Sequence, residues 1–376
     1  MVSAPRRVTP DEARDRLVGQ LGLRAMRASA GAEGAREVLA ALRLIQLDPL
    51  DRVGTNADLV AMARVDGLKR GGIYDALMPG HAFEHFAKER CLVPAEGFPY
   101  YRALAARRPW LRLHSRYEAI PEAAIEAVYA DVAERGPLTA GDLDDHGRAA
   151  PLDLSGWKTT TKVGTMALRV LWARCRVVVS GRRGRDKLYD LPERALGAVA
   201  EAAAPVEFAR WALLERVEAA GLLSVNAGPQ WSMLSETRTG ALVGELVSQG
   251  LLERVQVGEN ARIYLAPRGF LDRRFGDDDG QMRILGPLDP LLWDRKLVEH
   301  AFGFEYIWEV YKPAAQRRWG YYVCPLLHHG RLVGRFEGHV EAGELVVDRL
   351  WREEGAAFDE RAWQACRERH ASQLEI

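Results

Sequence analysis

Two polar side chains close a largely apolar stretch near the N-terminus, and their types are suited to hydrolysis. Leu44–Leu50 reads LIQLDPL, with Gln46 and Asp48 two positions apart and Pro49 directly after them. A carboxylate can accept a proton from water or stabilise a developing cation, while an amide holds the water in place. The alternative is a structural role, because acidic residues beside proline are common in turns. The pattern makes Gln46 and Asp48 candidate catalytic residues.

A helix should carry these two residues. Apolar side chains recur at 3/4 spacing over residues 34–47, which is typical of an amphipathic helix. Pro49 disfavours helical geometry at Asp48, so the helix should end there and present Asp48 where the chain turns. An earlier helix should begin after Thr9, with Glu12 completing a capping box.

A second polar cluster, His81-Ala-Phe-Glu84-His85, fits the H-x-x-E-H pattern of inverted zinc peptidase sites. On a helix, His81 and His85 would share one face, as two zinc ligands require. Such a site needs a further protein ligand, usually a downstream glutamate, and no glutamate occurs between Gly147 and Pro192. We therefore expect the cluster to line a surface or a cleft, and we predict neither a metal nor another cofactor.

The composition is that of an ordinary soluble globular protein. The chain has 376 residues, which suits two or three domains, and 48% of them are hydrophobic and 28% charged. Its four cysteines are scattered without a CxxC pair, which fits a reducing compartment. The N-terminus lacks a signal-peptide core, and no apolar run is long enough for a membrane span. We expect a cytoplasmic protein with no membrane partner.

Basic residues are concentrated in one region although the net charge is zero, with 52 basic and 52 acidic residues. Between Lys158 and Lys187 there are nine Lys or Arg residues and one acid, Asp186. Phosphate binding needs a concentrated basic face rather than a basic average. The cluster therefore indicates either a nucleic-acid contact or a solvated charged surface.

Residues 120–200 have the element order of a winged helix. A helix should run between Pro121 and Gly136, followed by a short element and by a longer helix around KTTTKVGTMALRVLWARC. Two β-prone runs then flank a Gly- and Arg-rich turn in VVVSGRRGRDKLYDL, which predicts a hairpin, or wing. The predicted DNA-binding residues are Lys158, Lys162, Arg182, Arg183, Arg185 and Lys187.

Residues 201–280 repeat this order with a less basic hairpin turning at 258–260, which suggests a packing scaffold. Residues 281–376 should form a small antiparallel sheet or partly closed barrel that is covered by the helix DERAWQACRERH. Its predicted strands are FEYIWEVYKP, WGYYVCPLL, GRLVGRFEGHV and ELVVDRLW. The predicted class is α+β, mainly helical, with tandem winged-helix units before this sheet. The predicted domains are 1–119, a winged-helix-like unit carrying Gln46 and Asp48, then 120–200, 201–280 and 281–376.

Several of these segments together resemble one family. The segments are IQLD, FEHFAKERCLVP, WARCRVVVSGRRGRDKLYDLPERAL, and LGPLDPLLWDR with FGFEYIWEVYKP and WGYYVCPLL. They are similar to the YcaQ/AlkZ family of bacterial winged-helix DNA glycosylases. The family's catalytic motif is Gln–apolar–Gln in one branch and Gln–apolar–Asp in the YcaQ branch, and Gln46-Leu47-Asp48 matches the second. The following LDRVGTNADLV departs from the family's Val-Asn step and Arg-His pair.

The resemblance implies a monofunctional DNA glycosylase that hydrolyses the N-glycosidic bond of N7-alkylated purines and unhooks interstrand crosslinks without a cofactor. Asp48 would stabilise the sugar cation or activate water, and Gln46 would orient that water. The partner would be alkylated or crosslinked double-stranded DNA at the nucleoid, and we expect a monomer. The alternative is a non-catalytic winged-helix DNA-binding protein or transcriptional regulator, which would prefer its operator by about 10³-fold or more.

Overall fold

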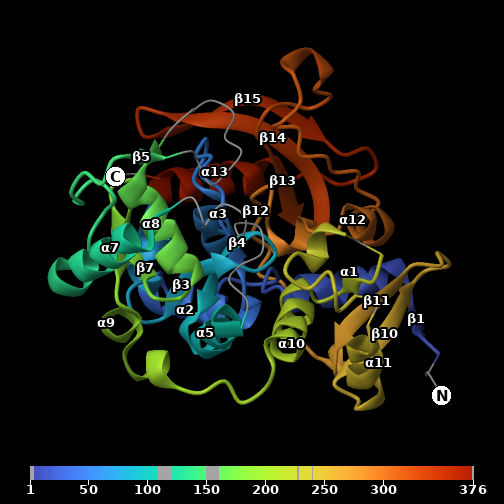
Figure 1. Ribbon diagram of the computed structural model, residues 1–376. Coiled ribbons are helices and arrows are strands. Elements are labelled where there is room, and N and C mark those ends of the chain that lie inside the picture. Colours follow the sequence, from blue (N-terminus) through green and yellow to red (C-terminus); the bar gives the residue numbers. More distant parts are fainter. Residues whose placement is uncertain (1–3, 108–119, 150–160, 227, 239, 375–376) are drawn as a thin grey trace. The chain divides into compact units, whose positions relative to one another are not determined.

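The computed structural model describes residues 4–107, 120–149, 161–226, 228–238 and 240–374. The chain divides into two units: residues 1–76, 86–91 and 212–376 form the first, and residues 77–85 and 92–211 form the second. Helices and small antiparallel sheets are mixed along the chain (Figure 1). The mixed helix and sheet class is confirmed, whereas the four predicted domain boundaries stay a prediction.

The helices of the first unit begin where the sequence offers caps. Helix α1 spans Pro10–Gln20, and the Thr9 side chain accepts the N–H of Glu12 in the predicted capping box. None of the helices in the described ranges is both long and apolar enough to cross a membrane. The others lying wholly or mostly in this unit are α2 (Gly31–Leu42), α3 (Asn56–Met62), α4 (Gly72–Leu77), α10 (Phe208–Ala220), α11 (Ala241–Ser248), α12 (Arg295–Phe302) and α13 (Glu360–Leu374).

The helix before the candidate catalytic pair ends earlier than predicted. Helix α2 ends at Leu42, and Arg43 takes a positive φ of 61°. The chain then forms the short strand β2 (Ile45–Gln46), and the N–H of Leu47 donates to the carbonyl of Arg90 at 2.8 Å. The helical prediction was wrong here because a backbone bond to a distant segment outweighs the local apolar spacing.

Two four-stranded sheets lie in the first unit. One has the order β1-β10-β11-β9, in which β10 and β11 form the predicted hairpin and β1 joins β10 in parallel. The other is antiparallel, with the order β12-β13-β14-β15, and α13 packs against β15 (Figure 1). Their strands are β1 (Arg6–Val8), β9 (Leu223–Ser224), β10 (Leu252–Val257), β11 (Ile263–Pro267), β12 (Arg283–Ile284), β13 (Val323–His328), β14 (Arg331–Glu341) and β15 (Glu344–Arg352).

One predicted strand does not form. Residues 304–313, all of them described, contain no strand, and β12 supplies the fourth strand of the C-terminal sheet instead. Side chains hold this segment: the Tyr306 hydroxyl donates to the carbonyl of Val323 at 2.7 Å, and the Glu309 carboxylate accepts the N–H of Trp319 at 2.7 Å. Its aromatic and β-branched residues pack through their side chains, and its backbone does not pair with another strand. Composition alone does not distinguish such a segment from a strand.

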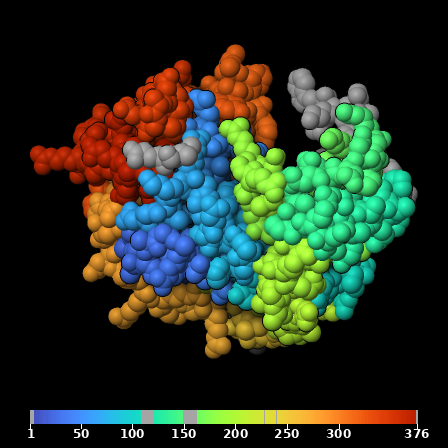
Figure 2. Space-filling model, turned by 90° about the vertical axis from the view of Figure 1, so that its left-hand side faces the viewer, coloured from blue at the N-terminus to red at the C-terminus, as the bar shows by residue number. Residues whose placement is uncertain are grey.

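The core of the C-terminal sheet joins segments from both ends of the sequence. Phe336 of β14 packs on Trp363 of α13 with ring centroids 5.3 Å apart, and Leu59 of α3 belongs to the same buried cluster. Figure 2 shows the early (blue) and late (orange to red) segments of the first unit lying against each other. The loop that follows β2 contributes Val53 to this cluster, so it is held by residues far along the chain.

Burial of His370 in α13 should make the first unit sensitive to acid. The ring donates to the carbonyl of Val53 at 2.8 Å, and burial lowers the pKa of His370 to about 4. The unfolded chain then takes up a proton that the folded one excludes, so stability should fall between pH 6.5 and about 4, by about 3 kcal/mol. Urea unfolding across this range would measure the loss. His370→Gln, which keeps a donor but cannot titrate, should flatten the dependence, and an unchanged slope would contradict the assignment.

The second unit contains the predicted basic hairpin. Helix α7 spans Glu122–Arg135 between Pro121 and Gly136, as predicted, and α8 spans Val163–Ala173. The hairpin is formed by β7 (Val178–Arg183) and β8 (Asp186–Asp190). The other elements are α5 (Phe98–Arg107), α9 (Pro192–Leu196), β5 (Arg148–Ala149) and β6 (Thr161–Lys162), while β3 (Ala82–Phe86) and β4 (Arg90–Pro94) carry the chain across the boundary between the units.

Candidate active site

Gln46 is the last residue of β2 and is held at its backbone. Its carbonyl accepts a hydrogen bond from the Asn56 side chain at 2.8 Å, and only 6% of Gln46 is exposed. Asn56 begins α3 after the N-cap Thr55, and its side-chain oxygen also accepts the N–H of Leu288 at 3.0 Å. One buried amide therefore joins β2, the start of α3 and the segment before α12, which limits how Gln46 can move.

The side chain of Gln46 meets a lysine that the sequence analysis did not select. Lys88 Nζ donates to Gln46 Oε1 at 2.8 Å, and it lies 5.1 Å from the ring centroid of Trp293. Burial lowers the pKa of Lys88 to about 8. The Trp293 ring is fixed in turn, since its N–H donates to the carbonyl of Leu288 at 3.0 Å. No local pattern in FAKERC signals this contact.

Asp48 lies in the turn after β2 and is half-buried. Its carboxylate accepts the N–H of Leu50 at 2.9 Å, so it spans Pro49 in a tight turn. Burial raises the pKa of Asp48, and the Leu50 bond opposes that shift only in part. The Tyr322 hydroxyl is buried and has no hydrogen-bond partner among the described residues, and the Asp48 charge contributes, after burial, to raising the pKa of Tyr322. Asp48 is thus a partly exposed carboxylate with few competing donors.

A buried ion pair holds the segment that precedes α12 and contacts Asn56. Arg64 donates to both carboxylate oxygens of Asp289, at 2.8 and 3.1 Å, and both side chains are completely buried. Arg64 also donates to the carbonyl oxygens of Leu21 and Val60, at 2.6 and 2.8 Å. Asp289 directly follows Leu288, whose N–H contacts Asn56, so this pair helps to place the residues that hold Gln46.

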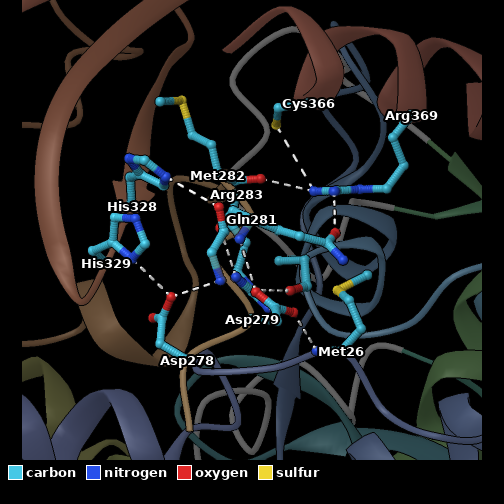
Figure 3. Close-up of polar contacts among 12 residues, drawn as sticks. Met26, Asp278, Asp279, Gln281, Met282, Arg283, His328, His329, Cys366 and Arg369 are labelled. Atoms are coloured by element: carbon cyan, nitrogen blue, oxygen red, sulfur yellow. Dashed lines mark hydrogen bonds and ion pairs between the residues drawn. The ribbon is translucent and has the colours of Figure 1, made fainter. Parts of the chain in front are cut away.

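The other end of this segment is fixed by the contacts in Figure 3. The Asp279 carboxylate accepts the N–H of Met26 at 2.9 Å and a guanidinium N–H of Arg283 at 2.6 Å. Arg283 is buried and also donates to the carbonyl of Ala63 at 3.1 Å. Residues 279–289 are therefore held at both ends, by the contacts of the more exposed Asp279 and by the completely buried Asp289, which makes them a support for Gln46.

In the second unit, two of the predicted DNA-binding residues are engaged with a buried acid. Arg182 and Lys187 both form ion pairs with Glu84, whose side chain is completely buried. Arg183 pairs with Asp142 at 2.9 Å but keeps 60% of its side chain exposed. Arg185, at the hairpin turn, and Lys162 are exposed, whereas Lys158 lies outside the described residues. The hairpin therefore offers a smaller free positive charge than its sequence suggests.

The H-x-x-E-H cluster does not have the geometry of a zinc peptidase site. Its last residues belong to strand β3, so His81 and His85 do not share a helix face. The Glu84 carboxylate bonds Arg182 and Lys187, and His85 stacks on Trp172 with ring centroids 4.7 Å apart. Within the described ranges, no group of three or more His, Cys, Asp or Glu side chains is arranged to hold a metal ion.

Comparison with known proteins identifies the family. A model of the family described as DNA glycosylase AlkZ-like matches residues 39–372. The chain belongs to the AlkZ-like DNA glycosylase family. Among solved structures, the fold is similar to that of the DNA glycosylase AlkZ of Streptomyces sahachiroi, with a TM-score of 0.62 at 18% sequence identity, over 98% of this chain and 97% of that one. The predicted family is therefore confirmed, and the solved structure supports the fold.

As an AlkZ-like DNA glycosylase, the protein is a DNA-repair enzyme that cleaves the bond between a base and its deoxyribose. The matched region includes Gln46 and Asp48 and begins just before them. A carboxylate and an amide two residues apart, at the end of β2 and in the turn after it, can hold a water molecule for that hydrolysis. Sequence reasoning selected this pair but missed Lys88, Asn56 and Trp293, which contact Gln46 or its support.

Proposed function

We propose that this DNA glycosylase removes N7-alkylated purines from double-stranded DNA and unhooks interstrand crosslinks, with Asp48 and Gln46 acting at the sugar. The observation that carries the proposal is the end of β2, where the anchored amide of Gln46 is followed, in the next turn, by the partly exposed carboxylate of Asp48. We further propose a monofunctional enzyme that needs no cofactor, acts as a monomer and works at the nucleoid, because its substrate is DNA.

The chemistry of an N7-alkylated purine requires few protein groups. Alkylation places a positive charge on the base, which then leaves as a neutral molecule without a general acid. The enzyme has to stabilise a sugar with oxocarbenium character and position one water. Asp48 supplies the negative charge for the sugar or accepts a proton from the water, and Gln46 holds that water. Such a site suits a crosslinked base, which cannot be flipped into a closed pocket as most excised bases are.

DNA binding is proposed for the winged-helix units. In residues 120–200, the order α7, α8, β7 and β8, with the backbone pairing of Leu138 and Tyr189, supports a winged helix with β7–β8 as its wing. Residues 201–280 offer α10, α11, β10 and β11 in the same order. The proposed DNA contacts are Lys158, Lys162, Arg182, Arg183, Arg185 and Lys187.

Base release from defined lesions tests the proposed substrate class. Purified protein is incubated with a duplex containing one N7-methylguanine and with a duplex crosslinked by nitrogen mustard. Heating in alkali should break the strand at the lesion, and the crosslinked duplex should yield separable strands. An undamaged duplex of the same sequence is the control. A regulator without glycosylase activity would bind but produce no breaks, and breaks before the alkali step would contradict a monofunctional enzyme.

Arg185→Ala should weaken DNA binding without changing stability. Its side chain is exposed at the hairpin turn, so its loss removes one phosphate contact and should lower the slope of log affinity against log salt by about 1. Fluorescence anisotropy at several salt concentrations measures this slope. Arg274→Ala, an exposed arginine of the first unit, is the matched control. Equal slopes for both variants would mean that Arg185 does not contact the DNA.

A further inference from the structure

Lys88 is a buried cation that forms no ion pair with a carboxylate of the described residues. Only 8% of the residue is exposed, and its ammonium has one hydrogen-bond partner in the described part of the chain, Gln46 Oε1. Burial, and after it the charges of Arg295 and Arg216, disfavour its protonated form. The charge of the neighbouring Glu89 and the Trp293 ring at 5.1 Å act in the opposite direction and do not restore the ordinary pKa of the lysine. Folding would be served as well by an apolar side chain of similar length, because an unpaired buried charge is costly.

The hydrogen bond from Lys88 determines which end of the Gln46 amide is available for chemistry. A lysine has only hydrogen-bond donors, so the group facing Lys88 has to be the amide oxygen. The amide nitrogen of Gln46 then points elsewhere, and it has no hydrogen-bond partner among the described residues. With its oxygen engaged and its backbone carbonyl bonded to Asn56, Gln46 presents N–H groups rather than a carbonyl.

We propose that Lys88 is a positioning residue of the glycosylase, which holds the Gln46 amide so that its N–H groups face the attacking water. The water oxygen accepts a hydrogen bond from Gln46 and the water proton is directed to Asp48, so one lone pair remains for the sugar carbon. Hydrolysis then joins the water oxygen to that carbon, breaks the bond to the base and transfers the water proton to Asp48. This inference rests on the proposed function of Gln46 and Asp48.

Lys88→Met tests the role because it removes the ammonium but keeps the length of the side chain. Single-turnover base release from N7-methylguanine DNA should slow by about 10- to 100-fold, as expected for losing a hydrogen bond from a charged donor. The midpoint of urea unfolding should stay equal or rise, since a buried charge is removed. Lys296→Met, an exposed lysine in the same unit, should match the parent protein in both measurements.

A double-mutant cycle separates positioning through Gln46 from a general structural effect. In a Gln46→Ala background, Lys88→Met should change the rate by less than about twofold, because the group through which it acts is gone. Fully multiplicative losses would overturn the proposal. If Lys88→Met does not fold, Gln46→Glu serves instead: it can pair with Lys88 but lacks N–H donors, so base release should fall by about 10²-fold while the protein stays folded. Parental activity of Gln46→Glu would also overturn the proposal.

The outcomes distinguish this inference from the proposed function. Parental activity in Asp48→Asn and Gln46→Ala would contradict both the proposed function of these two residues and the positioning role of Lys88. Loss of activity in these variants, with a parental rate in Lys88→Met, would remove only the positioning role. Borohydride identifies the remaining alternative, because direct attack of a lysine amine on the sugar carbon displaces the base and leads to an imine that borohydride reduces to a stable adduct. An adduct formed by the parent protein but not by Lys88→Met would make Lys88 a nucleophile and contradict positioning.

Discussion

Asp48→Asn is expected to slow release of N7-methylguanine by about 10²- to 10³-fold while leaving duplex affinity unchanged. The substitution keeps the shape of the side chain but removes the charge that would face the sugar or accept the water proton. The Leu50 N–H can still bond the amide oxygen, so the turn around Pro49 should survive. Single-turnover excision measures the rate, and anisotropy with the same duplex measures binding.

A neighbouring carboxylate provides the control for this prediction. Asp51 pairs with Arg70 at 2.7 Å and is also partly buried, so Asp51→Asn removes the same charge from the same loop without touching the proposed chemistry. Its excision rate should remain within a few-fold of the parent. Similar losses in both variants would indicate a general effect of loop charge and would argue against a specific role for Asp48.

The pH dependence of excision should follow the ionisation of Asp48. Burial raises its pKa, so the carboxylate loses its charge at a higher pH than an ordinary aspartate does. The excision rate should therefore fall as the pH is lowered through this raised pKa, and it should reach its full value at pH values above that pKa. Asp48→Asn should lack this acidic limb. A parent profile that is flat down to the usual aspartate range would contradict a catalytic carboxylate at this position.

Asp289→Ala should cause the largest loss of stability. It would leave the completely buried Arg64 guanidinium without its carboxylate, which typically costs about 3–5 kcal/mol. Excision should fall as well, because Asp289 follows Leu288 and the Leu288 N–H bonds the amide that holds Gln46. Urea unfolding measures the first effect and single-turnover kinetics the second.

Two comparisons make this stability prediction specific. Glu299→Ala breaks the exposed pair with Lys296 and should change stability by less than about 1 kcal/mol. Replacing both buried partners, as Arg64→Met with Asp289→Leu, should recover much of the loss, since no buried charge is then left unpaired. A single Asp289→Ala variant as stable as the parent would mean that Arg64 is compensated by its carbonyl contacts alone.

Local chemistry made much of the fold predictable from the sequence. The capping box of Thr9 and Glu12 forms as predicted, and α7 lies between Pro121 and Gly136. The turn of the β7–β8 hairpin contains Gly184 at a φ of 59°, a conformation that glycine adopts without strain. Such signals act over a few residues, so they can be read without knowing what the segment packs against. The Gln–apolar–Asp motif was likewise visible as a short pattern.

Tertiary contacts decided what the sequence could not. Residues 45 and 46 continue an apolar helical pattern but form a strand, because Leu47 pairs with Arg90. Lys88 reaches Gln46 from 42 positions along the chain, and Glu84 binds Arg182 and Lys187 from even further away. Pairings between distant segments leave no local periodicity, and the pKa of a side chain depends on its burial in the folded protein. The sequence by itself therefore determined the candidate pair and its family, whereas only the folded chain decided which partners orient that pair and which cations remain available for DNA.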